Sequence, residues 1–285
     1  MRLYLDCIPC FMQQALRAGR MATSDEKKLK QILDETGELV KTVSMHATPA
    51  EIGMSIYRIV TEVTGVHDPY KKIKQQHIAE TKAIFPELEK IVANSNDKLL
   101  TAIRIAIAGN VIDLGVKKSF DIVKDVESIL KQDFAVFDYG AFKTQLEKTE
   151  NILYIGDNVG ESVFDKILIK ELKKRVKYAV RSIPIINDVT MEDAIASGLD
   201  EVAELIDSGC ESPGIILEHS TPEFLEIFNT SGLVISKGQG NFEGLSDCKR
   251  QVFFMLKTKC PIISNHIGVE DGSIILKEHK FPEKI

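Results

Sequence analysis

The chain has 285 residues, a formal net charge of −6 and 44% hydrophobic residues, which is an ordinary composition for a globular protein with one large core or two domains. The negative charge argues against generic attraction to nucleic acid or to an anionic membrane. No apolar run reaches the roughly 20 residues of a membrane-spanning helix, and five sparsely spread cysteines argue against a disulfide framework, so we expect a cytoplasmic protein.

The N-terminal part of the chain is predicted to be helical. Its first segment, MRLYLDCIPCFMQQALRAGR, is interrupted by acidic and amide residues and does not have the pattern of a signal peptide. From Asp25 to about Gln132, apolar residues recur at i, i+3 and i+4. Helix starts are expected at Ser24–Asp25 and at Thr48, where Glu51 completes a capping box.

Cys7 and Cys10 form a Cys-x-x-Cys pair near the start of the chain. A structural zinc site needs four ligands, and no second such pair exists. Structural packing of the thiols is the first interpretation, and a metal or redox role is the alternative.

Beyond about Phe134 the pattern changes, because short apolar runs alternate with helical segments. Such runs are typical of buried parallel strands in βαβ units. We therefore predict a helical domain over residues 1–133 and a doubly wound, mostly parallel, Rossmann-like α/β domain over residues 134–285. The expected strands lie in NILYIGD, VKYAVRS, GIILE, GLVISKG, PIISNHIGV and SIILK.

Asp157 and Asn158 follow the first of these runs, in NILYIGDNVGESVFDKILI. In open α/β sheets, ligands bind outside the carboxyl ends of the strands, and a helix starting near Glu161 directs its N-terminal amides to the same place. The alternative is that Asp157 or Asn158 only caps that helix.

Asp188 lies at the end of a second run, in RSIPIINDVTMEDA. It is also a possible helix cap, as is Thr190. However, Mg²⁺ and Mn²⁺ take oxygen ligands, with one or two carboxylates completed by water and substrate phosphate. Asp157, Asn158 and Asp188 are therefore the candidate metal ligands.

Lys237 ends a third run and precedes Gly238-Gln239-Gly240-Asn241. A lysine beside such a turn suits a phosphate, because backbone amides form an anion nest and the ammonium supplies a point charge. The alternative is a surface lysine in a loop.

These motifs together resemble those of the DUF89 family of ARMT1-like damage-control phosphatases. GDNVGESVFD, RSIPIINDVTMEDA and SKGQGNFE are similar to its signature blocks, and DCIPC, DPYKKIK and AGNVIDLG are similar to others. The Cys-x-x-Cys pair resembles the archaeal-type branch. The resemblance runs from Asp6 to about Glu243.

The resemblance implies a divalent-metal-dependent phosphatase, with Mn²⁺, Ni²⁺, Co²⁺ or Mg²⁺, that acts on a small phosphorylated metabolite. It places the metal on Asp157, Asn158 and Asp188 and a phosphate contact on Lys237. It also favours substrate contact by Asn110 and Asp113. Without the resemblance, these two polar residues would be interpreted as hydrogen-bonding partners between helices. Arg181 is either a second phosphate clamp or an ordinary salt bridge.

The predicted mechanism is in-line attack by water on a metal-bound phosphate ester. Asp157, Asp188 and Lys237 are the catalytic candidates, and the candidate substrate contacts are Asn110, Asp113, Arg181, Lys237, Gly238, Gly240 and Asn241. An aspartyl-phosphate on Asp157 remains open. The rival functions are an S-adenosylmethionine-dependent methyltransferase and a non-catalytic phosphometabolite-binding protein. The sequence does not indicate the oligomeric state.

Overall fold

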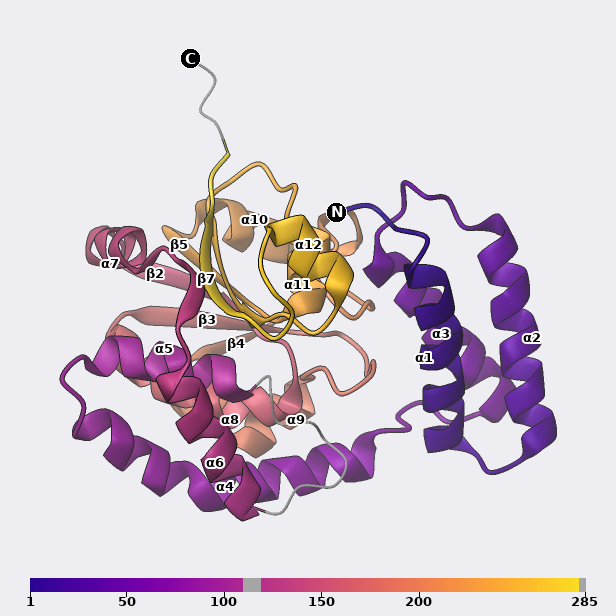
Figure 1. The fold of residues 1–285 in the computed structure, drawn as a ribbon, viewed down its shortest axis with the longest axis horizontal. Helices are drawn as coiled ribbons and strands as arrows, with labels where there is room; N and C mark the ends of the chain where they lie inside the picture. Colours follow the sequence, from indigo (N-terminus) through magenta and orange to yellow (C-terminus); the bar gives the residue numbers. More distant parts are fainter. Residues whose placement is uncertain (110–118, 282–285) are drawn as a thin grey trace.

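The computed structural model describes residues 1–109 and 119–281. Helices precede the first strand, and helices alternate with strands after it (Figure 1). The α-helices are α1 (Cys7–Ala22), α2 (Glu26–Thr42), α3 (Pro49–Thr64), α4 (Lys71–Ala93), α5 (Lys98–Gly109), α6 (Ser119–Lys131), α7 (Tyr139–Lys148), α8 (Val159–Leu172), α9 (Met191–Ser197), α10 (Pro222–Thr230), α11 (Gln239–Leu245) and α12 (Pro261–Ile267). The strands are β1 (Phe134–Phe137), β2 (Asn151–Ile155), β3 (Arg175–Val180), β4 (Glu204–Asp207), β5 (Leu233–Lys237), β6 (Val252–Lys257) and β7 (Ile274–His279).

The strands form one sheet in the order β1-β7-β6-β5-β2-β3-β4. Neighbouring strands are parallel except β6 and β7, which are antiparallel. The predicted α/β class with a mostly parallel sheet is therefore confirmed. Because β5, β2 and β3 are adjacent and parallel, their carboxyl ends lie together at one edge of the sheet.

Helices cover both faces of the sheet (Figure 1). One hydrophobic cluster joins one face to α4–α8, and a second joins the other face to α10–α12. Helix α8 lies between the sheet and the helices α4 and α5, so nearly all of its side chains are buried. Two acidic residues of α8, Glu161 and Asp165, are therefore buried where they face β5.

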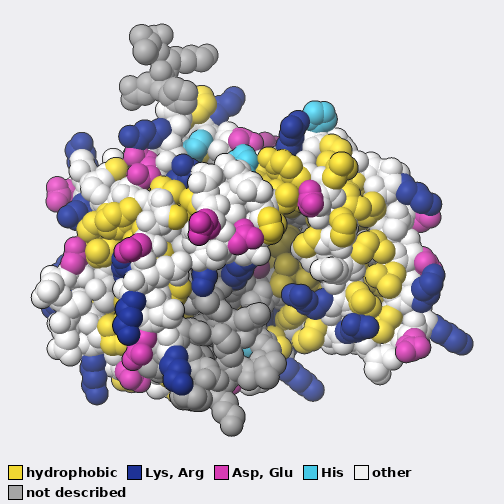
Figure 2. Space-filling view, viewed as in Figure 1, with side chains coloured by type: hydrophobic (Ala, Val, Ile, Leu, Met, Phe, Trp, Pro, Cys, Tyr) yellow, Lys and Arg dark blue, Asp and Glu magenta, His cyan; other side chains and the backbone are white. Residues whose placement is uncertain are grey.

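Helices α1–α3 share a third hydrophobic cluster and stand beside the carboxyl edge of the sheet (Figure 1). In the space-filling view, apolar side chains gather over this unit (Figure 2). Helices α4–α6, by contrast, contribute to the cluster under the sheet. The domain boundary between residues 133 and 134 stays a prediction, and the observed hydrophobic clusters separate α1–α3 from the rest.

Several local predictions are confirmed. Asp25 caps α2 through the N–H of Lys27, and Thr48 and Glu51 form the capping box of α3. No helix among the described residues is long and apolar enough to cross a membrane.

Two predicted strands are wrong. GIILE is a buried loop followed by a short 3₁₀ turn, because the N–H of Ile215 donates to the side chain of Asn241 rather than to a strand. PIISNHIGV contains helix α12, since Pro261 occupies its first turn and Gly268 ends it with φ of 82°. Strands β1, β4 and β6 were not among the predicted strands.

Candidate functional site

The segments after β2 and β3 are joined by their backbones. The N–H of Val159 donates to Asn187 O at 2.8 Å, and the N–H of Val189 donates to Asp157 O at 2.9 Å. Asp157 and Asn158 are thereby held beside Asp188. The structure therefore brings the three candidate ligands together at the carboxyl edge of the sheet. The predicted strand that ends at Asp188 is wrong, however, because β3 ends at Val180 and a loop over residues 181–187 returns Asp188 to Asp157.

The side chain of Asn158 does not cap α8, although the residue occupies the N-cap position. Its Nδ2 donates to Asp157 Oδ2 at 3.0 Å and to Glu161 Oε1 at 2.9 Å. These two acceptors fix which end of the amide carries the nitrogen. Its Oδ1 accepts no hydrogen bond from the described residues, so it is left for another electropositive partner.

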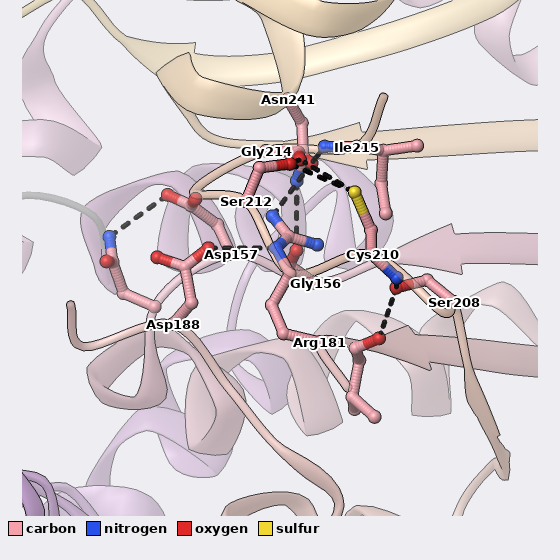
Figure 3. Close-up of polar contacts among 12 residues, drawn as sticks. Gly156, Asp157, Arg181, Asp188, Ser208, Cys210, Ser212, Gly214, Ile215 and Asn241 are labelled. Atoms are coloured by element: carbon pink, nitrogen blue, oxygen red, sulfur yellow. Dashed lines mark hydrogen bonds and ion pairs between the residues drawn. The ribbon is translucent and has the colours of Figure 1, made fainter. Parts of the chain in front are cut away.

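Asp188 is oriented by Arg181, which lies beside it (Figure 3). Arg181 is completely buried, and its Nε donates to Asp188 Oδ2 at 2.9 Å. The other carboxylate oxygen accepts no hydrogen bond from the described part of the chain. Arg181 therefore holds one oxygen of Asp188 and leaves the other toward the cavity.

Asn241 supports Arg181 in turn (Figure 3). Its Oδ1 accepts from Arg181 Nη2 and from the N–H of Ile215, and its Nδ2 donates to the carbonyls of Gly156 and Lys237. These four bonds use the full capacity of the amide. The structure therefore does not favour the predicted substrate contact of Asn241. Arg181 is also buried, but its Nη1 has no hydrogen-bond partner among the described residues, so a substrate contact of Arg181 stays a prediction.

Lys237 has a different place from the one predicted. Its side chain is completely buried, and its Nζ donates to Glu161 Oε2 at 2.6 Å, to Asp165 Oδ1 at 2.8 Å and to Ala106 O at 2.8 Å. Asp165 also accepts from the hydroxyls of Tyr154 and Tyr178. These partners fill the three donor positions of the ammonium, so the structure does not favour the predicted phosphate contact.

Several carboxylates are buried together in and beneath this site. Asp157, Glu161, Asp165 and Asp188 are all buried; Arg181 pairs with Asp188, and Lys237 pairs with Glu161 and Asp165. Crowding carboxylates in a region shielded from water is costly and favours positive charge beside them.

The pKa values of two of these carboxyls reflect their burial and crowding. Burial, followed by repulsion from Glu161 and Asp188, raises the pKa of Asp157 well above its usual value. Burial raises the pKa of Asp188 to about 6, although the guanidinium of Arg181 opposes the rise. A divalent cation beside Asp157 and Asp188 would favour the charged form of both carboxyls.

The residues present fit such a cation. Among the described residues, no three His, Cys, Asp or Glu side chains are placed to hold a metal ion by themselves. The candidate set instead combines two carboxylates with an amide oxygen, which are the hard ligands that Mg²⁺ and Mn²⁺ accept while keeping positions for water or phosphate.

A cavity of about 260 Å³ opens over these three residues, between the carboxyl edge of the sheet and helix α1. Phe11, Gln14 and Pro49 form part of the wall on the α1–α3 side. Gln239, Gly240 and the residues around Cys260 form part of the wall on the other side. Helices α1 and α3 therefore wall the cavity on the side opposite the strand ends.

Lys259 lines this cavity, and the sequence analysis missed it. It follows β6, is exposed, and its positive charge acts to lower the pKa of Asp157. Among the described residues of the cavity wall, it is the one basic side chain. The apolar run VFFML before Lys259 is typical of a strand. Because that strand, β6, is parallel to β5, its carboxyl end lies at the same edge of the sheet.

The glycines of the predicted anion nest have separate roles. Gly238 has φ of 77°, and a Cβ there would overlap the Asp157 carboxylate. Its N–H donates to Met255 O. Gly240 lines the cavity, so a substrate contact there stays a prediction. Asn110 and Asp113 lie outside the described residues.

The Cys-x-x-Cys pair lies on the wall of the same cavity, together with Cys260. Cys7 begins α1, and burial raises the pKa of both Cys7 and Cys10. Both thiols are therefore mainly protonated near neutral pH, which does not favour a reactive thiolate.

Known proteins resemble the chain over nearly its whole length. The profile of the damage-control phosphatase ARMT1-like domain matches residues 3–275. A damage-control phosphatase from Pyrococcus horikoshii is 34% identical, with 99% of each chain covered. A damage-control phosphatase from Archaeoglobus fulgidus is 31% identical, with 95% of this chain and 97% of that protein covered.

Structural comparison agrees. The crystal structure of a DUF89 family protein from Pyrococcus horikoshii superposes with a TM-score of 0.89 at 32% identity, covering 98% of this chain and 100% of that one. An uncharacterized protein from Methanocaldococcus jannaschii is 33% identical, with 95% of this chain and 93% of that protein covered.

Proposed function

The chain belongs to the family of damage-control phosphatase ARMT1-like, or DUF89, proteins, and from this we propose that it is a divalent-metal-dependent phosphatase of small phosphate monoesters. The observation that carries the metal dependence is the meeting of Asp157, Asn158 and Asp188 on the cavity wall, where oxygen ligands of the kind that a hard divalent cation accepts lie side by side. Asp157, Asn158 and Asp188 hold the cation in this proposal.

A divalent cation bound there would polarise the phosphoryl group and offset its charge. The protein side chains position the ligands and the attacking water. Arg181 and Glu161 fix the orientation of Asp188 and Asn158, so the oxygens facing the cavity are preorganised. Asp157 or Asp188 orients the water that attacks in line, and helix α1 closes the cavity on one side.

Lys259 is the phosphate-contacting cation in this proposal, in place of Lys237. It is exposed on the cavity wall, whereas the ammonium of Lys237 has no position left for a ligand. Its positive charge stabilises the phosphoryl oxygens as charge spreads over them.

Lys259→Met should lower kcat for the best phosphate ester by about 10²-fold, on the scale of losing one electrostatic stabiliser. Metal affinity should change little, because Lys259 is not a ligand. Lys148→Met, at an exposed site on α7, is the control. Unchanged steady-state kinetics in the Lys259 variant would remove this residue from the mechanism.

Cys7→Ser combined with Cys10→Ser should keep turnover within about tenfold of the parent, a difference of about 1.4 kcal/mol in barrier. The reason is that a hard-metal phosphatase has no step that needs a thiolate. Circular dichroism checks the fold and phosphate release measures the rate. Complete loss of turnover in a folded double variant would place the thiols in the chemistry.

The experiment that tests the proposed function is a phosphate-release screen over small phosphate esters with Mn²⁺, Mg²⁺, Co²⁺ and Ni²⁺ in turn. We expect turnover with at least one metal and one ester. Esters that bind without turnover under every metal would instead support a non-catalytic binding protein, and tight metal-free binding of S-adenosylmethionine would support a methyltransferase.

A further inference from the structure

The turn that precedes Asp188 contains a strained residue. Ile186 has φ of 46°, a left-handed backbone that a β-branched residue rarely adopts. The N–H of Asp188 donates to Ile185 O at 3.0 Å and closes a four-residue turn in which Ile186 holds the first central position. Turns with positive φ at this position are dominated by Gly, Asn and Asp. The chain therefore has isoleucine where glycine would be free of strain.

The packing of this turn explains why the strain persists. Ile185 is 2% exposed and belongs to the hydrophobic cluster of α1–α3, and Ile186 packs against the same cluster. Among the described residues beyond Ile73, only these two take part in that cluster. Ile186 also lines the cavity over Asp157 and Asp188. Strain of this kind persists only where the surrounding contacts fix it, and here the α1–α3 unit supplies those contacts.

The turn also determines where the following residues lie. The N–H of Val159 donates to Asn187 O, and the N–H of Val189 donates to Asp157 O. These two hydrogen bonds join the segment after the turn to the end of β2. Both depend on the direction in which the chain leaves the turn, so the turn decides whether Asp188 meets Asp157.

We propose that Ile186 is a positioning residue of the candidate metal site. Its side chain packs on the α1–α3 cluster and holds a left-handed backbone that turns Asp188 back toward Asp157. The packing of the α1–α3 unit is thereby coupled to the geometry of the metal ligands. The inference rests on the metal site of the proposed function, and it gives the α1–α3 unit a role beyond that of a cavity wall.

Glycine and alanine at two positions of the loop separate backbone strain from loss of a side chain. Because glycine adopts positive φ freely and alanine does not, metal-free Ile186→Gly should have an unfolding constant about fivefold smaller than that of Ile186→Ala. Ile183 lies in the same loop, is 39% exposed and does not have a positive φ. At that position alanine should give the more stable variant, since glycine has more freedom in the unfolded chain.

Urea unfolding measures both pairs of variants. Glycine more stable than alanine at Ile186, with the opposite order at Ile183, is the expected result. The same order at both positions would show that the backbone of Ile186 is not strained, and it overturns the proposal.

Amide hydrogen exchange of the metal-free proteins tests the positioning role. In Ile186→Gly, the amides of Val159 and Val189 should exchange at least about tenfold faster, because the segment after the turn opens locally. The amide of Val234, in the central strand β5, should keep its rate, whereas general loss of stability would accelerate its exchange as well. Ile186→Val retains the branched side chain and should restore slow exchange. Ile183→Gly should leave all three rates unchanged.

Calorimetric titration with Mn²⁺ distinguishes this inference from the proposed function. The dissociation constant should rise at least about tenfold in Ile186→Gly and stay close to the parent value in Ile186→Val. A parent that does not bind Mn²⁺ would count against the proposed metal dependence, and exchange at Val159 and Val189 would then decide on Ile186 alone. Parent-like exchange at these two amides, or parent-like Mn²⁺ affinity in Ile186→Gly, overturns the proposal.

Discussion

Lys237→Met should destabilise the protein by about 3–5 kcal/mol, the cost of removing one partner from a buried ion pair. The variant leaves Glu161 and Asp165 without their ammonium, and both carboxylates are completely buried. Methionine retains the apolar stem of lysine but cannot donate to either acid. Urea unfolding of the metal-free protein measures the change.

Lys170→Met is the matched control for this prediction. Lys170 also pairs with a carboxylate at 2.6 Å, that of Glu89, but both side chains are more than two-fifths exposed. Its loss should cost less than about 1 kcal/mol. A Lys237 variant as stable as the Lys170 variant would show that the buried network does not support the fold.

Asp157→Asn should abolish the stabilisation by Mn²⁺ and should not lower the stability of the metal-free protein. The parent should gain about 2.7 kcal/mol at a Mn²⁺ concentration about 100 times its dissociation constant. The variant loses a ligand, but it also removes a buried carboxylate that Glu161 and Asp188 repel. Its metal-free unfolding temperature should therefore equal or exceed that of the parent.

Thermal unfolding with and without Mn²⁺ measures both effects. Asp200→Asn, at an exposed carboxylate remote from the cavity, is the control, and it should respond to Mn²⁺ as the parent does. If Mn²⁺ stabilised the Asp157 variant as strongly as the parent, the assignment of Asp157 as a ligand would be wrong.

The meeting of Asp157 and Asp188 was predictable only in part. A parallel sheet delivers the carboxyl ends of neighbouring strands to one edge, which places the residues after β2 and β3 in the same region. Asp188 reaches Asp157 only because the loop over residues 181–187 folds back, and backbone hydrogen bonds hold it there. The capping interpretation of Asn158 could be rejected only from the structure, because it depends on where one amide points.

The burial of Lys237 is indicated by the sequence pattern of β5 and α8. Side chains alternate along a strand, so Lys237 is in phase with Leu233 and Ile235, which pack into the cluster beneath the sheet. Glu161 and Asp165 are one helical turn apart on the otherwise largely apolar α8. Two acids on a buried helix face require a buried cation, and Lys237 supplies it.

Other features depend on contacts between distant segments. The cavity joins α1 and α3 to loops after β2, β3, β5 and β6, and no local pattern indicates that the Cys-x-x-Cys pair faces Asp157. Likewise, PIISNHIGV has the composition of a strand, and only Pro261 and Gly268 at its two ends signal the helix that forms.

The most direct test of the central claim is phosphate release from the best ester by metal-free protein, before and after addition of one equivalent of Mn²⁺. The account predicts no release before addition and release after it in the parent, with neither in Asp188→Asn. Undiminished release by the metal-free parent would contradict a metal-dependent phosphatase centred on Asp157, Asn158 and Asp188.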